Sequence, residues 1–318
     1  MIFPDTSDAP VCLQMVRAAF APTGGLDDLQ HELIQDLARI VWGIEYGSVE
    51  LVATTEFHSV DQEIKDHAVH LIALLELIEH PLRPEVADSV LEFATLQQMD
   101  VQMLGAARSM ANEHIAAMYF DLQRHSWYAH ETIHEVRQGH FYELLRSKLA
   151  YLNIVEDKQI ARKWESLLDC PEGSWGKAIG EFYVQHGFPF PGEKLGIYEL
   201  GARHDWVHVL TGYETDPEGE LDVFAFIAGS MGDARGLVLL GLALALFQNG
   251  SIHHVQMKLI KNARTDTLGD PGAIEKFANA VRRGSLCTVD VMGTVDFFAH
   301  KDMDLETARE SFGVVPLT

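Results

Sequence analysis

The segment from His204 to Glu220 has the residue types and spacing best suited to chemistry in this chain. It begins with the pattern His-Asp-x-x-His, and a glutamate follows after eleven intervening residues. An α-helix turns about 100° per residue, so the two imidazoles lie one turn apart with the aspartate beside them. Two imidazoles and two carboxylates can bind a divalent metal and leave room for water or substrate. The predicted ligands of such a site are His204, Asp205, His208 and Glu220.

The elements around these residues must bring the glutamate back to the histidines. Gly212 suits the end of the histidine helix, because glycine readily adopts the left-handed conformation of a helix C-cap. Asp216-Pro217 matches an N-cap followed by proline at the first helical position. Glu220 would then lie in the first turns of a second helix, with Gly212 and Gly219 shaping the connection. The sequence therefore predicts a helix–loop–helix that holds the metal site.

A second histidine motif runs from His130 to His134, with the sequence His-Glu-x-x-His of zinc proteases. His140 lies where metzincins have a third ligand, but Arg137 replaces the glycine that they require, and Gly139 comes two residues late. A continuous helix would carry His140 about 80° around the axis and nearly three turns from His130. We expect a histidine-rich, solvent-facing or interface helix here. A second metal site, or ligands donated across a domain interface, is the alternative.

The His204 segment also resembles the signature of the coenzyme Q (ubiquinone) biosynthesis family called Coq-four. That signature is His-Asp-x-x-His, a glycine four residues on and a Gly-Glu pair. The matching residues are His204, Asp205, His208, Gly212, Gly219 and Glu220. Looser similarity covers residues 171–176 (Pro-Glu-Gly-Ser-Trp-Gly), 185–188 (Gln-His-Gly-Phe) and a C-terminal stretch at 304–314. The resemblance spans residues 165–318, about half of the chain.

This resemblance implies an all-helical protein that binds a divalent metal and a prenylated benzenoid. The family is implicated in ubiquinone synthesis as a lipid-binding organiser of the biosynthetic complex and in oxidative decarboxylation of an aromatic carboxylate. By carry-over, His204, Asp205, His208 and Glu220 are the ligands. Residues 1–150 do not resemble the short N-terminal part of the family, so a changed substrate is an alternative.

Three functions follow as hypotheses. The first is a metal-dependent enzyme that decarboxylates or hydroxylates a prenylated or related aromatic carboxylate. The second is a lipid-binding scaffold with a structural metal, and the third is a metallohydrolase. The sequence does not choose between iron and zinc, and it assigns no catalytic residue. Asp205 is one methylene shorter than the glutamate base of zinc peptidases, which disfavours that chemistry. Weaker candidates for contacts with substrate or with the ligands are Arg203, Tyr213 and Glu218.

The composition of the chain limits the kinds of partner that it is expected to bind. The 318 residues include 47 acidic against 24 basic ones, giving a net charge of −23. That charge disfavours nucleic acid as a partner, because phosphates need a basic face, and it disfavours simple docking to anionic lipid. Three cysteines without a C-x-x-C pattern, and no basic-then-apolar start, lead us to expect a cytoplasmic protein. The partners considered are an aromatic or isoprenoid small molecule, proteins of a biosynthetic complex, a membrane surface touched peripherally, and a second copy of the chain (homo-oligomer).

Apolar periodicity predicts an all-α fold, a multi-helix orthogonal bundle with little or no sheet. Stripes at i, i+3, i+4 cover residues 26–45 and 60–80, and Pro84 marks a further helix start. Three or more helices are expected over 84–165, with weak breaks near Gly105 and Gly139. Residues 46–55 are the only strand-compatible piece and remain ambiguous.

Three other segments carry expectations about organisation. Residues 187–196, rich in glycine and proline, predict an ordered loop leading to the metal helix. The apolar run 236–247 is about half the ~20 residues that span a bilayer, so a buried core helix is expected. A groove for an isoprenoid tail beside its small residues, or contact with a membrane, is the alternative. We place a domain boundary near 160, separating an N-terminal helical region (1–160) from the metal-binding domain (161–318), although no linker composition marks it.

Overall fold

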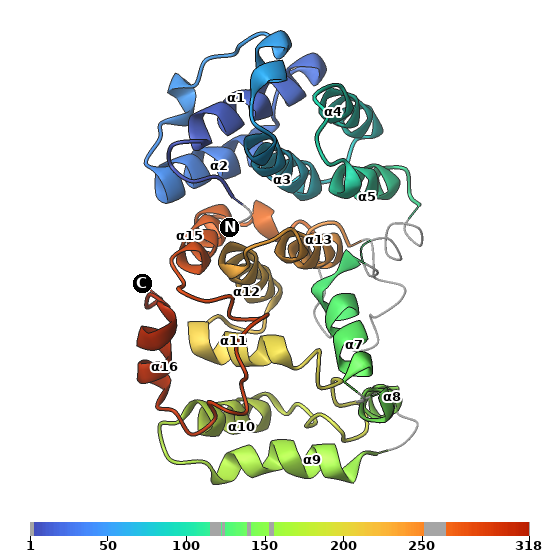
Figure 1. The fold of residues 1–318 in the computed structure, drawn as a ribbon, viewed down its shortest axis with the longest axis vertical. Coiled ribbons are helices and arrows are strands. Elements are labelled where there is room, and N and C mark those ends of the chain that lie inside the picture. Colours follow the sequence, from blue (N-terminus) through green and yellow to red (C-terminus); the bar gives the residue numbers. More distant parts are fainter. Residues whose placement is uncertain are drawn as a thin grey trace. The chain divides into compact units, whose positions relative to one another are not determined.

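The computed structural model describes residues 3–114, 122, 125–138, 141–152, 156–250 and 265–317. Throughout these residues the regular structure is helical, and the only β-type pairing is an isolated bridge between Ser174 and Asp304 (Figure 1). The all-α prediction is confirmed. None of the described helices is long and apolar enough to cross a bilayer.

The chain forms two compact units, each built from two separate stretches of sequence. Unit 1 comprises Met1–Ser126 and Thr215–Ser285. Its described helices are α1 (Ala9–Phe20), α2 (Asp28–Leu37), α3 (Gln62–Ile78), α4 (Pro84–Leu96), α5 (Gln102–Ala111), α12 (Pro217–Ser230), α13 (Arg235–Phe247) and α15 (Ala273–Ser285). Unit 2 comprises Trp127–Glu214 and Leu286–Thr318. Its described helices are α7 (Trp127–Arg137), α8 (Phe141–Tyr151), α9 (Lys158–Glu165), α10 (Trp175–His186), α11 (Arg203–Thr211) and α16 (Leu305–Phe312).

These units do not follow the division at 160 expected from the sequence. Within unit 1, α15 packs on α2 and α13 packs on α3, so late segments complete the core of the N-terminal helices. Amphipathic stripes show that a helix has a buried face, but not which distant helix covers it. The absence of a Pro/Gly/Ser linker near 160 agrees with the interleaved arrangement.

In unit 1, α12 packs extensively against α15, and two glycines permit their close approach. A Cβ added at Gly284 would lie 2.0 Å from the Phe226 carbonyl oxygen, and one at Gly229 would lie 2.4 Å from that of Val281. Side chains at these positions would force the backbones apart. The two glycines therefore fix how α12, the helix that carries Glu220, is seated.

The apolar run 236–247 lies within α13, and most of its side chains are buried. A Cβ at Gly241 would lie 2.8 Å from Met103 Cε and 3.4 Å from Leu77 Cδ1. The space beside this glycine is therefore filled by protein side chains, which leaves no groove at this position. The expectation of a buried core helix is confirmed.

Most of the local expectations for the N-terminal region are also met. The stripe over 26–45 forms α2 and a π-helical turn (Ala38–Trp42), the stripe over 60–80 forms α3, and Pro84 starts α4. The break near Gly105 is wrong, because this glycine lies inside α5 between buried neighbours. The ambiguous piece 46–55 forms 3-10 turns and irregular chain, and 187–196 is a loop as expected. The break near Gly139 lies outside the described residues.

Candidate metal centre

Helix α11 presents the two motif histidines and is closed tightly at its C-terminus. Gly212 forms the C-cap with φ of +81°, and its N–H donates to the His208 carbonyl at 2.7 Å. Arg309 of α16 donates from Nε to the Leu210 carbonyl at 2.7 Å and from Nη2 to that of Val209 at 3.1 Å. These bonds satisfy carbonyls that have no partner within the helix, so the end of α11 is well defined.

Helix α12 begins as the sequence predicts. Asp216 is the N-cap, and its side chain accepts a hydrogen bond from the Gly219 N–H at 2.8 Å. Pro217 occupies the first turn, where its missing N–H costs nothing. The short connection 212–216 therefore turns the chain back, and Glu220 lies in the first turn of α12.

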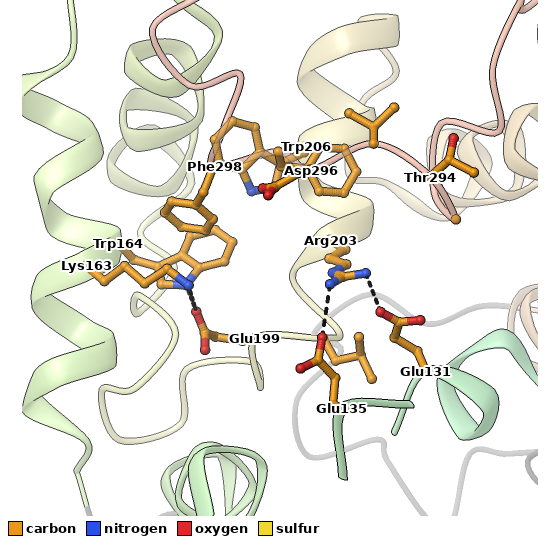
Figure 2. Close-up of a pocket in the computed structure, with 14 residues that line it drawn as sticks. Glu131, Glu135, Lys163, Trp164, Glu199, Arg203, Trp206, Thr294, Asp296 and Phe298 are labelled. Atoms are coloured by element: carbon orange, nitrogen blue, oxygen red, sulfur yellow. Dashed lines mark hydrogen bonds and ion pairs between the residues drawn. The ribbon is translucent and has the colours of Figure 1, made fainter. Parts of the chain in front are cut away.

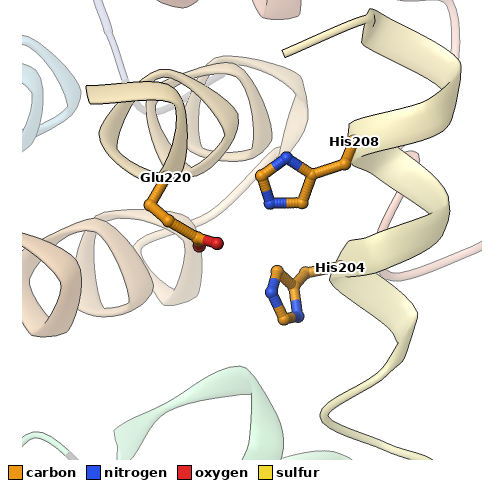
Figure 3. A group of neighbouring side chains, drawn as sticks. All are labelled: His204, His208 and Glu220. Atoms are coloured by element: carbon orange, nitrogen blue, oxygen red, sulfur yellow. The ribbon is translucent and has the colours of Figure 1, made fainter. Parts of the chain in front are cut away.

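The described structure brings three of the four predicted ligands together. His204, His208 and Glu220 each offer one ligand atom, and these atoms all lie within 4.8 Å of one another. Figure 3 shows the two imidazoles from successive turns of α11 and the carboxylate from α12 converging on one point. His208 is buried, and the other two are partly exposed. Two nitrogens and one oxygen at this separation form a donor set that fits a divalent transition metal.

Backbone carbonyls orient both imidazoles. His204 Nδ1 lies 2.6 Å from the Gly201 carbonyl oxygen, and His208 Nδ1 lies 3.1 Å from that of Tyr213. A carbonyl can only accept, so Nδ1 carries the proton in both rings and Nε2 of the neutral imidazole keeps its lone pair. This is the usual arrangement of metal-binding histidines, in which the far nitrogen is anchored by a hydrogen bond.

Asp205 makes a different set of contacts. The Tyr183 hydroxyl donates to its Oδ2 at 2.5 Å, and its Oδ1 lies 3.2 Å from His204 Nε2. Burial, then the charge of Asp205 and the hydrogen bond to it, raise the pKa of Tyr183 well above its usual value, so the phenol stays protonated. The lone pair on His204 Nε2 and the Asp205 carboxylate repel each other unless a proton or a metal cation lies between them. The position between these two atoms therefore favours a positive charge. Asp205 lies outside the group of three, and its role as a fourth ligand stays a prediction.

The weaker candidates have partners of their own. Arg203 Nη1 lies 3.0 Å from Glu131 Oε1, and Glu218 pairs with Lys276 at 2.5 Å. The contribution of Tyr213 is the carbonyl that anchors His208. Tyr213 thus supports the site through its backbone.

The His-Glu-x-x-His motif lies on α7, where His130 and His134 are exposed. Its Glu131 pairs with Arg203. In the part of the chain that the structure describes, neither histidine belongs to a group of three metal-binding side chains. This agrees with the expected solvent-facing helix, while His140 lies outside the described residues.

Buried aromatic residues support α11 from within unit 2, and sequence reasoning did not assign them this role. Trp175 and Trp206 pack edge to face at 5.3 Å, and Trp175 Nε1 donates to the Trp206 carbonyl at 3.1 Å. The ring centroid of Trp164 lies 6.2 Å from that of Trp206 and 5.7 Å from that of Tyr183. A Cβ at Gly176 would lie 2.7 Å from the Lys301 carbonyl, which explains the glycine after Trp175. The segment 171–176 carries part of the family resemblance, but its packing partners lie too far along the chain to be inferred from the sequence.

No family model matches this sequence, and no curated protein matches it. The likeness to the Coq-four family therefore rests on the residues quoted above and stays a prediction.

Proposed function

We propose that this protein is a metal-dependent enzyme of the Coq-four type, acting on a prenylated or related aromatic carboxylate in quinone biosynthesis. The observation that carries the proposal is the convergence of His204, His208 and Glu220 within 4.8 Å. The aromatic substrate comes from the resemblance alone. Oxidative decarboxylation or hydroxylation is the reaction class that we favour.

The number and type of ligands support catalysis over a purely structural role. Structural zinc sites are commonly closed by four protein ligands, whereas catalytic sites keep a position for water or substrate. Two histidines and one carboxylate also match the donor set of non-haem iron oxygenases, which leave positions open for small molecules. A lipid-binding scaffold with a structural metal is therefore the less favoured alternative.

The chain's own residues prepare the site for a metal. The carbonyls of Gly201 and Tyr213 hold the Nδ1 protons and aim each ring. Asp205, held by the Tyr183 hydroxyl, adds negative charge beside His204. When bound, iron would supply redox chemistry toward an aromatic ring, and zinc would supply Lewis acidity.

A metallohydrolase is the other enzymatic candidate, because two histidines and a glutamate are also the ligands of hydrolytic zinc enzymes. The identity of the metal separates the two candidates. Iron would favour the oxidative enzyme, and zinc with activity that does not need dioxygen would favour the hydrolase.

The test is elemental analysis of anaerobically purified protein. We expect about one equivalent of iron or zinc per chain in the wild type, and its loss in His204→Ala/His208→Ala and in Glu220→Gln. The matched controls are His31→Ala/His58→Ala and Glu63→Gln, because all three of these residues are exposed. Circular dichroism serves to check that each variant is folded.

An Asp205→Asn variant asks whether this carboxylate is a ligand. Metal loss as complete as in Glu220→Gln would support a fourth ligand, and retained metal would support a positioning role. A folded wild type that binds no metal, even after reconstitution with divalent ions, would overturn the proposal.

A further inference from the structure

Unit 2 contains a cavity of about 510 Å³ that none of the three clustered metal-binding residues lines. Side chains of α7, α9 and α11 and the segment 293–298 surround it (Figure 2). Its volume lies in the range of roughly 300–1,000 Å³ that is typical of small-molecule sites.

Part of the lining is aromatic. Trp164 and Trp206 are each 1% exposed, and Phe298 packs edge to face against both, with ring centroids 5.3 and 5.5 Å away. The two buried tryptophans therefore form a rigid support for Phe298, which is partly exposed. Aromatic faces carry negative electrostatic potential and attract organic cations.

The charged side chains that line the cavity also favour a cationic ligand. Four carboxylates and two basic groups face the cavity, namely Glu131, Glu135, Glu199, Asp296, Lys163 and Arg203. The Arg203 guanidinium already lies 3.0 Å from Glu131 and 3.7 Å from Glu135. An anionic ligand would have to displace these partners and would still meet an excess of negative charge. A cation would relieve that excess.

One lysine shows how the cavity holds an ammonium group. Lys163 Nζ lies 2.8 Å from Glu199 Oε1 and 4.1 Å from the centre of the Phe298 ring. Trp164 Nε1 donates to the same Glu199 oxygen at 2.9 Å and fixes this carboxylate. Figure 2 shows Lys163, Glu199 and Phe298 together at one side of the cavity. The Lys163 side chain is 49% exposed, so it can leave for solvent at small cost.

We propose that this cavity binds a small organic ammonium ion, an aryl or alkyl amine, whose charged group replaces Lys163 Nζ between Glu199 and Phe298. The rest of the ligand lies against the partly exposed Phe298 ring, which packs on the buried Trp164 and Trp206. The proposal does not depend on the metal-dependent function, because none of the three clustered metal-binding residues lines the cavity.

Isothermal titration of the full chain with three probes of similar shape tests the charge preference. Benzylamine is cationic at pH 7, benzyl alcohol is neutral and benzoate is anionic. We expect benzylamine to bind about tenfold or more tightly than benzyl alcohol, as a charge-assisted contact predicts, and benzoate to bind most weakly. No binding of benzylamine at millimolar concentration, equal affinities or the reverse order would overturn the proposal.

Two variants test the location of the site, because they should change the affinity for benzylamine in opposite directions. Lys163→Met removes the resident ammonium and should tighten benzylamine binding about tenfold, whereas Glu199→Gln removes its partner and should weaken binding about tenfold. The control Glu181→Gln changes an exposed carboxylate outside the cavity and should leave the affinity unchanged. Weaker binding by a folded Lys163→Met would contradict the displacement. If Glu199→Gln does not fold, the order of the three probes in the wild type still decides.

Discussion

Glu76 is placed where an ionised carboxylate is least tolerated. It lies on α3, is 1% exposed, and neither of its carboxylate oxygens has a hydrogen-bond partner among the described residues. Burial, followed by the charge of Glu79, raises the pKa of Glu76 well above its ordinary value of 4.5. The folded protein therefore holds this group as the neutral acid, and we predict that it makes stability depend on pH.

The sign follows from proton binding. Above pH 4.5 the unfolded chain releases the Glu76 proton while the folded chain keeps it. Rising pH therefore favours the unfolded state by about 1.4 kcal/mol per pH unit, until the pH reaches the folded pKa. The stability that the neutral Glu76 contributes is fully present below pH 4.5 and is lost as the pH rises toward and through the folded pKa. Glu76→Gln, which mimics the neutral acid in shape, should remove this slope.

The assay is urea unfolding followed by circular dichroism at pH 5.5 and 6.5, in EDTA so that metal binding is absent. Between these two pH values the wild type should lose more stability than Glu76→Gln, by up to about 1.4 kcal/mol, the limit that one proton sets. Glu63→Gln, an exposed position on the same helix, is the matched control and should behave as the wild type. An identical pH dependence in Glu76→Gln and the wild type would show that the carboxyl is ionised or hydrated in the folded state, which refutes the reasoning.

Two further predictions concern the end of α11. Gly212→Ala should lower the free energy of unfolding, measured by urea titration, by about 1 to 2 kcal/mol, because the backbone at Gly212 has a φ of +81°. Gly47→Ala is the control and should be nearly neutral, because Gly47 has equally open space around it and no positive φ. Arg309→Lys should lower the free energy of unfolding, measured by heat or urea, by about 2 kcal/mol, since one ammonium group cannot reproduce both hydrogen bonds to the Val209 and Leu210 carbonyls. Arg282→Lys, at an exposed position, is the control. Equal stability of these two variants would contradict the capping role of Arg309.

Sequence reasoning succeeded where the cause is local. Gly212 and Asp216 end and begin helices through contacts within a few residues, so spacing alone placed them. Their positions in turn bring Glu220 toward the histidines. The break expected at Gly105 failed because the cost of glycine in a helix, about 1 kcal/mol, is outweighed by the burial of its neighbours in α5.

What the sequence could not predict depends on residues far apart in the chain. The Tyr183 bond to Asp205 joins α10 to α11, and the Arg309 cap joins α16 to α11. Neither follows a periodic pattern, because each needs the tertiary arrangement of unit 2 to exist first. The same holds for the cavity beside Trp206, whose lining comes from four separate stretches.

The interleaving of the two units has a consequence for synthesis on the ribosome. Unit 1 is complete only when α15 has been translated to residue 285, and unit 2 is complete only when α16 has followed. The early helices α2 and α3 therefore emerge with apolar faces whose covering segments do not yet exist. Such nascent chains are targets for chaperones and for aggregation. The order in which the chain is made thus delays closure of either hydrophobic interior until most of it has left the exit tunnel.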